Sequence, residues 1–273
     1  MGMAETPAPT VDAHAHIFTR AMPFAATAHA RPDYDYPVDA YLADLDRHGI
    51  AYGVIAAASL FDDGNAYTLA ALATHSRLRA TVIAPPDTDQ RTLRDMADLG
   101  VVGVRLVWRR LSAPPALDAE PYRGFLHRLA ECGLHVELLA GSTGLTKLLP
   151  QLAESPVNVV VDHFGAPSHG SAERRAGTDA LCRAIDIGRV WVKLSAGFRL
   201  PVAVAGEVAG QLLAHAGPER LLWGSDAPFV NHEDDASYDG AINLYRRLVP
   251  DAAVRTAIDH TALALFFNRE SRS

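Results

Sequence analysis

The sequence has few cysteines and no long apolar run. Cys132 and Cys182 are its two cysteines, and they lack the spacing of metal-binding pairs. We therefore expect free thiols in a reducing compartment, the cytoplasm. No apolar run approaches the roughly 20 residues of a membrane span, which excludes a membrane-spanning protein. Residues 1–10 contain neither a basic start nor an apolar stretch, so we predict a flexible N-terminal segment there and no signal peptide.

Positive charge is also in short supply. The chain has 25 Lys and Arg residues against 32 Asp and Glu residues, a formal net charge of -7. An acidic surface of this kind disfavours nucleic acid as a partner. We expect a small-molecule substrate, with neither a nucleic-acid nor a membrane partner. The sequence does not fix the number of subunits, and a homo-oligomer is compatible with it.

The pattern of apolar residues predicts one α/β barrel. At 273 residues with 49% hydrophobic content, the chain matches the length of about 250 residues that is typical of this architecture. Short apolar runs alternate with segments in which apolar residues recur at three- and four-residue steps, which indicates strands alternating with helices. Parallel strands joined by right-handed crossovers follow. Residues 11–273 are thus expected to form a single (β/α)8 TIM barrel with an extra C-terminal helix.

The boundaries of these elements can be read from the same pattern. The expected strands span residues 10–17, 51–58, 79–84, 101–107, 134–139, 157–162, 190–195 and 220–224. The expected helices are Val38–His48, Tyr67–His75, Gln90–Leu99, Pro121–Cys132, Leu145–Ala153, Ala172–Ile187, Val202–Ala216 and Asp239–Leu248. The proline-punctuated, tyrosine-containing segment Arg20–Pro37 is expected to cover the barrel mouth or to pack on a neighbouring subunit.

Four polar residues stand where predicted strands end. They are His14, His16, His163 and Asp226. His14 and His16 are two residues apart, so on a strand they share one face. Because the active site of such a barrel gathers at the C-terminal ends of its strands, we expect all four to converge. A carboxylate there can take a proton from water and later deliver it to a leaving alkoxide.

Six short motifs carry a family resemblance. In sequence order they are Asp12–His16, Gly100–Arg105, Gly133–Glu137, Val161–Gly165, Val192–Ser195 and Trp223–Asp226. In these motifs the chain resembles the amidohydrolase superfamily (amidohydrolase-related family 2), and within it the branch of 2-pyrone-4,6-dicarboxylate lactonases and related sugar lactonases. The resemblance implies a hydrolase that opens a lactone or related cyclic ester. Water would be activated by Asp226, and the carbonyl would be polarised by His14, His16 and His163.

The resemblance leaves the cofactor and two other functions open. Most of the superfamily holds a divalent metal on such histidines, whereas the pyrone lactonase branch works without one. We expect no metal; the alternative is one Zn or Mn ion on His14, His16, His163 and Asp226. Glu137 and Lys193 lie on predicted strands, but a one-residue slip would turn either side chain away from the site. The alternative functions are a metal-dependent decarboxylase or other lyase of this superfamily, and a non-catalytic small-molecule binding protein.

Substrate-binding residues are expected on the loops after the strands. Arg105 stands where the resembling lactonases grip a carboxylate, Arg110 follows in the same loop, and Ser59 and Asn65 can donate hydrogen bonds. Three positions depart from the relatives: Leu139 replaces a tyrosine, Ala166 an arginine and Phe229 a histidine. An unpaired charge in an apolar pocket is costly. We therefore expect a substrate with at most one acidic group on Arg105 and an apolar body against Leu139 and Phe229.

Overall fold

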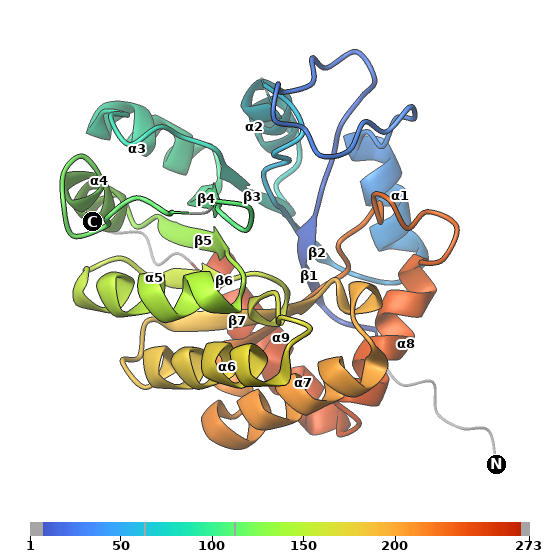
Figure 1. The fold of residues 1–273 in the computed structure, drawn as a ribbon. Coiled ribbons are helices and arrows are strands. Elements are labelled where there is room, and N and C mark those ends of the chain that lie inside the picture. Colours follow the sequence, from blue (N-terminus) through green and yellow to red (C-terminus); the bar gives the residue numbers. More distant parts are fainter. Residues whose placement is uncertain (1–7, 63, 112, 269–273) are drawn as a thin grey trace.

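The computed structural model describes residues 8–62, 64–111 and 113–268. Within them, eight parallel strands form one sheet in the order β1 to β8, with helices around its outside (Figure 1). The strands are β1 (Val11–Ala15), β2 (Tyr52–Ile55), β3 (Leu78–Val82), β4 (Val101–Val107), β5 (His135–Leu139), β6 (Val159–Val161), β7 (Val190–Ser195) and β8 (Leu221–Gly224). The predicted (β/α)8 barrel is confirmed, and each strand overlaps its expected range.

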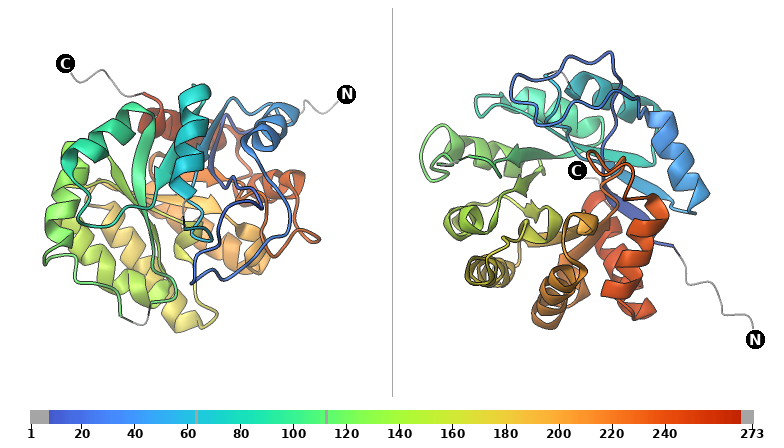
Figure 2. Two further views of the ribbon diagram at one scale, coloured as in Figure 1. Left: turned by 90° about the horizontal axis from the view of Figure 1, so that it is seen from above. Right: turned by 45° about the vertical axis from the view of Figure 1, so that its right-hand side comes forward.

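The helices form a ring outside the strands (Figure 2). They are α1 (Val38–Arg47), α2 (Gly64–Thr74), α3 (Gln90–Asp98), α4 (Tyr122–Glu131), α5 (Ser142–Glu154), α6 (Ser171–Ile185), α7 (Val202–Ala216), α8 (Tyr238–Leu248) and α9 (Ala252–Phe266). The extra C-terminal helix is α9. Its Ala262 and Phe266 pack with Val11, Val54 and Val102 of three strands. Within the described ranges, no helix combines the length and the apolar composition of a membrane span.

The barrel closes where β1 meets β8. Ala15 forms a parallel bridge with Ala227 just beyond β8. Two backbone hydrogen bonds of 2.8 Å cross this seam, from His16 N to Ala227 O and from Asp226 N to His14 O. The closure therefore joins the end of β1, where His14 and His16 lie, to the turn that carries Asp226.

Asp12 clamps the same seam from a buried position. Its Oδ1 accepts a hydrogen bond from Ser225 N at 2.8 Å, and its Oδ2 accepts from Ser225 Oγ and from Tyr238 OH, each at 2.6 Å. Between Asp12 and Ala15 the pairing with β2 shifts by one residue, an irregularity of the kind that a β-bulge produces. A bulge changes the direction of the side chains near it, and His14 lies within the shifted stretch.

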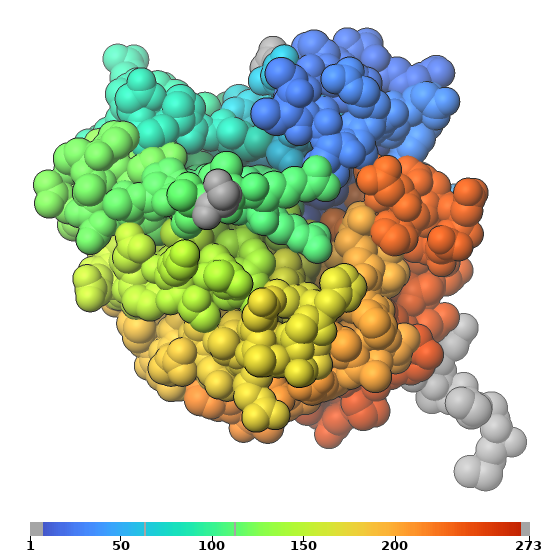
Figure 3. Space-filling view, in the orientation of Figure 1, coloured from blue at the N-terminus to red at the C-terminus, as the bar shows by residue number. Residues whose placement is uncertain are grey.

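The segment after β1 lies over the barrel mouth. Phe18 packs with Leu60, Phe61 and Val230 in a small apolar cluster, and Tyr34 OH donates a hydrogen bond to Glu233 at 2.9 Å. Figure 3 shows this blue segment beside the orange segment near residue 230 on one face of the molecule. The expectation that Arg20–Pro37 covers the mouth agrees with this packing.

The start of the chain is only partly described. Residues 1–7 of the predicted flexible segment lie outside the described residues. Pro9 is buried, and the carbonyl of Thr10 accepts hydrogen bonds from the amides of Ala51 and Tyr52. The last residues of the predicted segment are therefore held against β2.

Candidate active site

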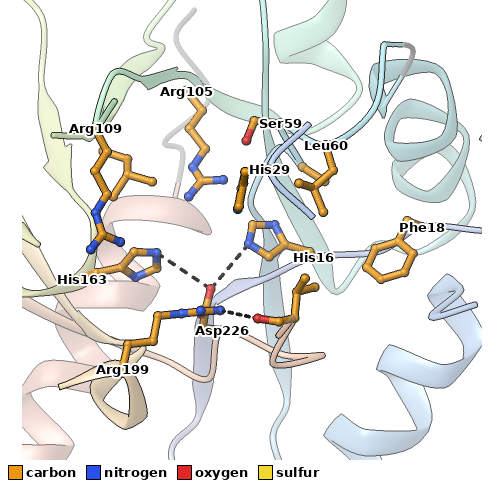
Figure 4. Close-up of a pocket in the computed structure, with 13 residues that line it drawn as sticks. His16, Phe18, His29, Ser59, Leu60, Arg105, Arg109, His163, Arg199 and Asp226 are labelled. Carbon is orange, nitrogen blue, oxygen red and sulfur yellow. Dashed lines mark hydrogen bonds and ion pairs between the residues drawn. The ribbon is translucent and has the colours of Figure 1, made fainter. Parts of the chain in front are cut away.

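A pocket opens at the C-terminal ends of the strands. It is lined by His16, His163 and Asp226, together with the three arginines Arg105, Arg109 and Arg199. In Figure 4 the side chains of Arg105 and Arg109 point toward the two histidines, while Arg199 approaches Asp226. The site therefore combines a carboxylate, imidazoles and several guanidinium groups in one hollow.

The Asp226 carboxylate is the point at which the predicted residues meet. Its Oδ1 lies 3.6 Å from His14 Nε2, 3.5 Å from His16 Nε2 and 3.8 Å from His163 Nε2. Its Oδ2 accepts a hydrogen bond from Arg199 Nε at 3.1 Å. Asp226 itself has a left-handed backbone, with φ of 65°. The structure thus brings together all four residues that the sequence singled out.

The surroundings of these groups fix their charge near neutral pH. Burial opposes ionisation of Asp226, but His163, a hydrogen bond from His16, His14 and Arg199 outweigh it, so the pKa of Asp226 lies well below its ordinary value. Burial lowers the pKa of His163 to about 4. Burial and then the charge of Lys193 hold the pKa of His14 well below its usual range. The site presents a carboxylate beside the neutral imidazoles of His14 and His163.

Hydrogen bonds to the far ring nitrogens restrict what each histidine can do. His16 Nδ1 lies 2.8 Å from the carbonyl oxygen of Ala56. Because a carbonyl only accepts, Nδ1 carries a proton, and Nε2 of His16 faces the pocket. His163 Nδ1 lies 2.8 Å from Ser195 Oγ. A hydroxyl both donates and accepts, so this contact is compatible with either tautomer of His163.

Behind His14, two cations and two carboxylates are buried together. Arg105 Nε lies 3.0 Å from both Glu137 Oε1 and Asp162 Oδ2. Lys193 Nζ contacts Glu137 Oε2 and lies 3.4 Å from Asp162 Oδ1 and 3.0 Å from His14 Nδ1. Burial opposes ionisation of Asp162, but Arg105, His14 and Lys193 hold its pKa well below its ordinary value. Glu137 and Lys193, whose facing the sequence left open, both point into this cluster.

The predicted substrate-binding residues divide into two groups. Ser59, Leu139 and Arg105 line the pocket. The Arg105 guanidinium is already held by the two carboxylates and donates from Nη1 to the Ala57 carbonyl at 2.7 Å, so few of its donors remain for a substrate.

The other three predicted residues are not among those that line the pocket. Asn65 binds the backbone of Ile83 through both its amide oxygen and its amide nitrogen. Arg110 is exposed. Phe229 packs edge-on against Phe198, with ring centroids 5.4 Å apart, and Val230 lines the pocket in its place.

Three pocket residues were missed or undervalued by the sequence reasoning. Arg109 precedes the predicted Arg110 in the same loop, and it lines the pocket without a hydrogen-bond or ion-pair partner in the part of the chain described. Arg199 ends the short 3-10 helix η2 (Gly197–Arg199) directly after β7, so its place in the chain was a usable signal. His29 comes from the irregular mouth segment, where no periodic pattern indicates which side chains turn inward.

Two groups of side chains lie close enough together to hold a metal ion. One is His14, His16 and Asp226, and the other is His14, Asp162 and His163. Both contain His14, whose Nε2 has no hydrogen-bond partner among the described residues. A histidine ligand must offer a lone pair, commonly while its other nitrogen donates to a carboxylate or carbonyl. Here Nδ1 is hydrogen-bonded to Lys193. The positions suit one divalent ion, but the hydrogen bonding of His14 does not.

Comparison with known proteins gives a consistent picture. A family model described as Amidohydrolase matches residues 11–267. The 4-sulfomuconolactone hydrolase of Rhizobium radiobacter is 29% identical over 260 residues, covering 90% of this chain and 86% of the relative. The 2-pyrone-4,6-dicarboxylate hydrolase of Comamonas testosteroni is 28% identical over 276 residues, covering 91% and 87%.

A solved structure agrees with these sequence matches. It is a Pseudomonas putida protein described as a 2-pyrone-4,6-dicarboxylic acid hydrolase. The two chains superimpose with a TM-score of 0.86 at 36% identity, over 98% of this chain and 100% of that one.

Proposed function

This chain belongs to the amidohydrolase family, and we propose that it is a hydrolase that opens an anionic lactone or related cyclic ester. The observation that carries the proposal is the Asp226 carboxylate, which meets three imidazole nitrogens at the floor of a pocket lined by arginines. Its relatives in this family include two lactone hydrolases with acidic substrates, as their names state. Both the reaction type and the charge of the pocket support the same substrate class.

The proposed chemistry begins with a water molecule at Asp226. The water oxygen attacks the lactone carbonyl carbon while its proton passes to the carboxylate. Donors on the histidines, first of all His14 Nε2–H, stabilise the negative charge that develops on the carbonyl oxygen. The ring C–O bond then breaks, and the proton is returned to the leaving oxygen to give an open hydroxy acid. General acid–base help of this kind contributes about 10²–10⁴ to the rate.

His16 supplies the proton affinity that Asp226 lacks as a base. A carboxylate whose pKa is held below its ordinary value is a weak proton acceptor on its own. His16 Nε2 lies 3.5 Å from Asp226 Oδ1, so the two side chains can share the proton taken from water. The Ala56 carbonyl then holds the imidazolium through Nδ1–H. In this proposal His16 works with the base, whereas His14 polarises the carbonyl.

The acidic group of the substrate is assigned to Arg109. Arg105 is occupied by two carboxylates and Arg199 by Asp226, which leaves Arg109 as the pocket guanidinium without a partner in the described ranges. The apolar side chains Leu139 and Val230 lie on the same pocket. We therefore propose a substrate with one acidic group and an apolar body, with the anion on Arg109 in place of Arg105.

The test is a panel of monoanionic and dianionic lactones, followed by proton release. The protein is expected to hydrolyse at least one member, and Asp226→Asn is expected to lower kcat by at least about 10²-fold while leaving the fold intact. Asp234→Asn, an exposed carboxylate in the same region of the chain, is the matched control and should retain full turnover. Near-normal turnover in folded Asp226→Asn would exclude this residue as the base.

The decarboxylase alternative makes an opposite prediction. It requires a divalent ion at these histidines, and therefore release of CO₂ from an aromatic or related acid that stops on chelation and returns with Zn²⁺ or Mn²⁺. The hydrogen bonding of His14 favours the lactonase. A non-catalytic binding protein would bind lactones from the panel without proton release.

Two further properties belong to the proposal. We place the enzyme in the cytoplasm, which the unpaired thiols of Cys132 and Cys182 support. We also propose that residues 11–273 act as one domain, since the strands of a single sheet run from Val11 to Gly224 and α9 packs on them. A homo-oligomer remains an expectation.

A further inference from the structure

Lys193 is a fully buried lysine that points at a catalytic histidine. Its Nζ lies 3.0 Å from His14 Nδ1 in a hydrogen bond, contacts Glu137 Oε2 and lies 3.4 Å from Asp162 Oδ1. These three acceptors come from β1, β5 and the turn after β6. Lys193 does not reach the pocket lining, so it must act through the side chains that it touches.

The charges of the cluster identify Lys193 as an ammonium group. Glu137 and Asp162 bring two negative charges, and Arg105 neutralises one of them through contacts of 2.9–3.0 Å. A second buried carboxylate without a counter-ion is strongly unfavourable. An ammonium group at Lys193 balances it. Because an ammonium nitrogen donates and never accepts, the hydrogen bond to His14 runs from Lys193 to the lone pair of Nδ1.

The competing partner of His14 Nδ1 is Asp162. Its Oδ1 lies 3.2 Å from Nδ1, but that oxygen has no hydrogen-bond partner within the described residues. The contact is therefore close but lacks the alignment of a hydrogen bond, whereas Lys193 Nζ lies 3.0 Å from Nδ1 in one. If Nδ1–H donated to Asp162, Nε2 would offer a lone pair, as in a metal ligand. With Lys193 as the donor, the proton of neutral His14 lies on Nε2.

We infer that Lys193 is a positioning residue that holds His14 as its Nε2–H tautomer, which makes His14 a hydrogen-bond donor toward the reacting carbonyl and closes the site to a divalent ion. The role of the donor rests on the proposed lactonase function; the tautomer and the metal exclusion do not. The unpartnered Nε2 lies 3.6 Å from Asp226 Oδ1, beside the place where a carbonyl is attacked. Both candidate metal groups lose a ligand because His14 belongs to both.

The variant that tests this must keep the cluster neutral. Lys193→Met alone leaves Glu137 and Asp162 with Arg105 as their one cation in this cluster and is expected to be unstable. The double variant Lys193→Met/Glu137→Gln removes one positive and one negative charge and leaves the Arg105–Asp162 pair in place. Asp162 can then accept Nδ1–H, which frees the Nε2 lone pair. Lys147→Met is the matched control, because Lys147 is the chain's other lysine and is exposed on α5.

Two readouts independent of turnover decide the question. The first is long-range proton–nitrogen NMR of protein labelled with ¹⁵N-histidine, with His14→Asn used to assign the signals. The parent protein and Lys147→Met should show His14 with the proton on Nε2, and the double variant should show it on Nδ1. The second is calorimetric titration with Zn²⁺. The double variant should bind one equivalent at least about tenfold more tightly than the parent protein, the scale of outer-shell effects on metal affinity.

The possible outcomes separate the inference from the proposed function. A His14 proton on Nδ1 in the parent protein, or equal Zn²⁺ affinity in the parent and the folded double variant, would overturn the inference. Failure of every lactone in the panel, with the tautomer and Zn²⁺ results as expected, would overturn only the lactonase proposal and leave the assigned role of Lys193 standing.

Discussion

Arg109 and Arg110 are neighbours in the chain, yet only Arg109 lines the pocket. Replacing Arg109 by Met removes one charge-assisted contact with the substrate anion, which costs about 1.5–3 kcal/mol. For a monoanionic lactone we therefore expect KM to rise roughly ten- to a hundredfold with little change in kcat. Steady-state kinetics of Arg109→Met and Arg110→Met measure this directly. Arg110→Met is the matched control, and equal effects of the two variants would contradict the assignment.

His163 links the site to the stability of the protein. Its pKa in the folded protein is about 4, because burial disfavours the charged imidazole, against an unperturbed value of 6.5. As the pH falls from 6.5 toward 4, His163 takes up a proton in the unfolded chain but not in the folded protein. The free energy of unfolding therefore decreases over that range. At 1.36 kcal/mol per pH unit, the loss from this residue between pH 7 and pH 5 is about 2 kcal/mol.

The measurement is denaturant unfolding at both pH values in the parent protein and in His163→Asn. Other groups titrate in the same range, so the quantity of interest is the difference between the two proteins. The parent protein should lose about 2 kcal/mol more than the variant on going from pH 7 to pH 5. Identical losses would show that His163 has an ordinary pKa.

The convergence of the residues at strand ends was predictable, because few folds bring the ends of several strands together. Three histidines and an aspartate after apolar runs point to one barrel mouth, and the structure gathers them around Asp226 Oδ1. The partners of these residues were not predictable, since the Lys193–His14 contact joins residues 179 positions apart. Nor could the sequence distinguish Arg109 from Arg110, because loop backbone, which has no fixed period, decides which one turns inward.

At the level of elements, β1 and β8 approach so closely that no side chain fits between them at Gly224. A Cβ on Gly224 would lie 2.5 Å from His14 Cβ and 2.8 Å from His14 N. Gly224→Ala should therefore displace β1, destabilise the protein by about 1–3 kcal/mol, as overpacking does, and lower activity by moving His14. Chemical denaturation and lactone kinetics measure the two effects.

Gly210→Ala provides the control for this substitution. Gly210 lies on the exposed side of α7, and a Cβ there would meet nothing within 4 Å. Alanine in a helix interior is more favourable than glycine by about 0.5–1 kcal/mol, so this variant should be slightly stabilised and fully active. Destabilisation by both substitutions alike would mean that close packing against His14 is not the cause.

The sequence predicted elements better than their register. Periodicity places β4 over residues 101–107 and α7 over residues 202–216, as observed, because apolar spacing directly reflects which side is buried. The register shift in β1 has no such signature, since one extra residue in a strand does not alter the kinds of residue that the strand contains. For the same reason the facing of Glu137 and Lys193 required the structure.

At the scale of the whole molecule, the barrel is held unevenly around its circumference. β4 and β5 pair along five residues, from Gly103 with His135 to Val107 with Leu139. Across the seam between β1 and β8, the structure describes one bridge, two backbone hydrogen bonds, a hydrogen bond from Ser225 Oγ to His14 O and the hydrogen bonds of Asp12. Local openings of a protein span free energies from near zero up to that of global unfolding. The seam amides of His16 and Asp226 should therefore exchange with solvent at a lower free energy than those of β4 and β5.

Native-state hydrogen exchange at increasing urea concentrations tests this ordering. The amides of His16 and Asp226 should exchange through an opening that depends weakly on urea, whereas amides between β4 and β5 should exchange only by global unfolding. Exchange of both sets with the same urea dependence would mean that the barrel opens as one unit.

The seam also runs through the candidate site. His14 and His16 lie on its β1 side, and Asp226 lies on its β8 side. A brief parting of the two edges would separate Asp226, the proposed base, from His14 and His16 while the other strands stayed paired. Catalysis would then be the first property to fail on warming and the last to return on cooling. Activity would then be lost at a temperature several degrees below the one at which spectroscopy first detects unfolding.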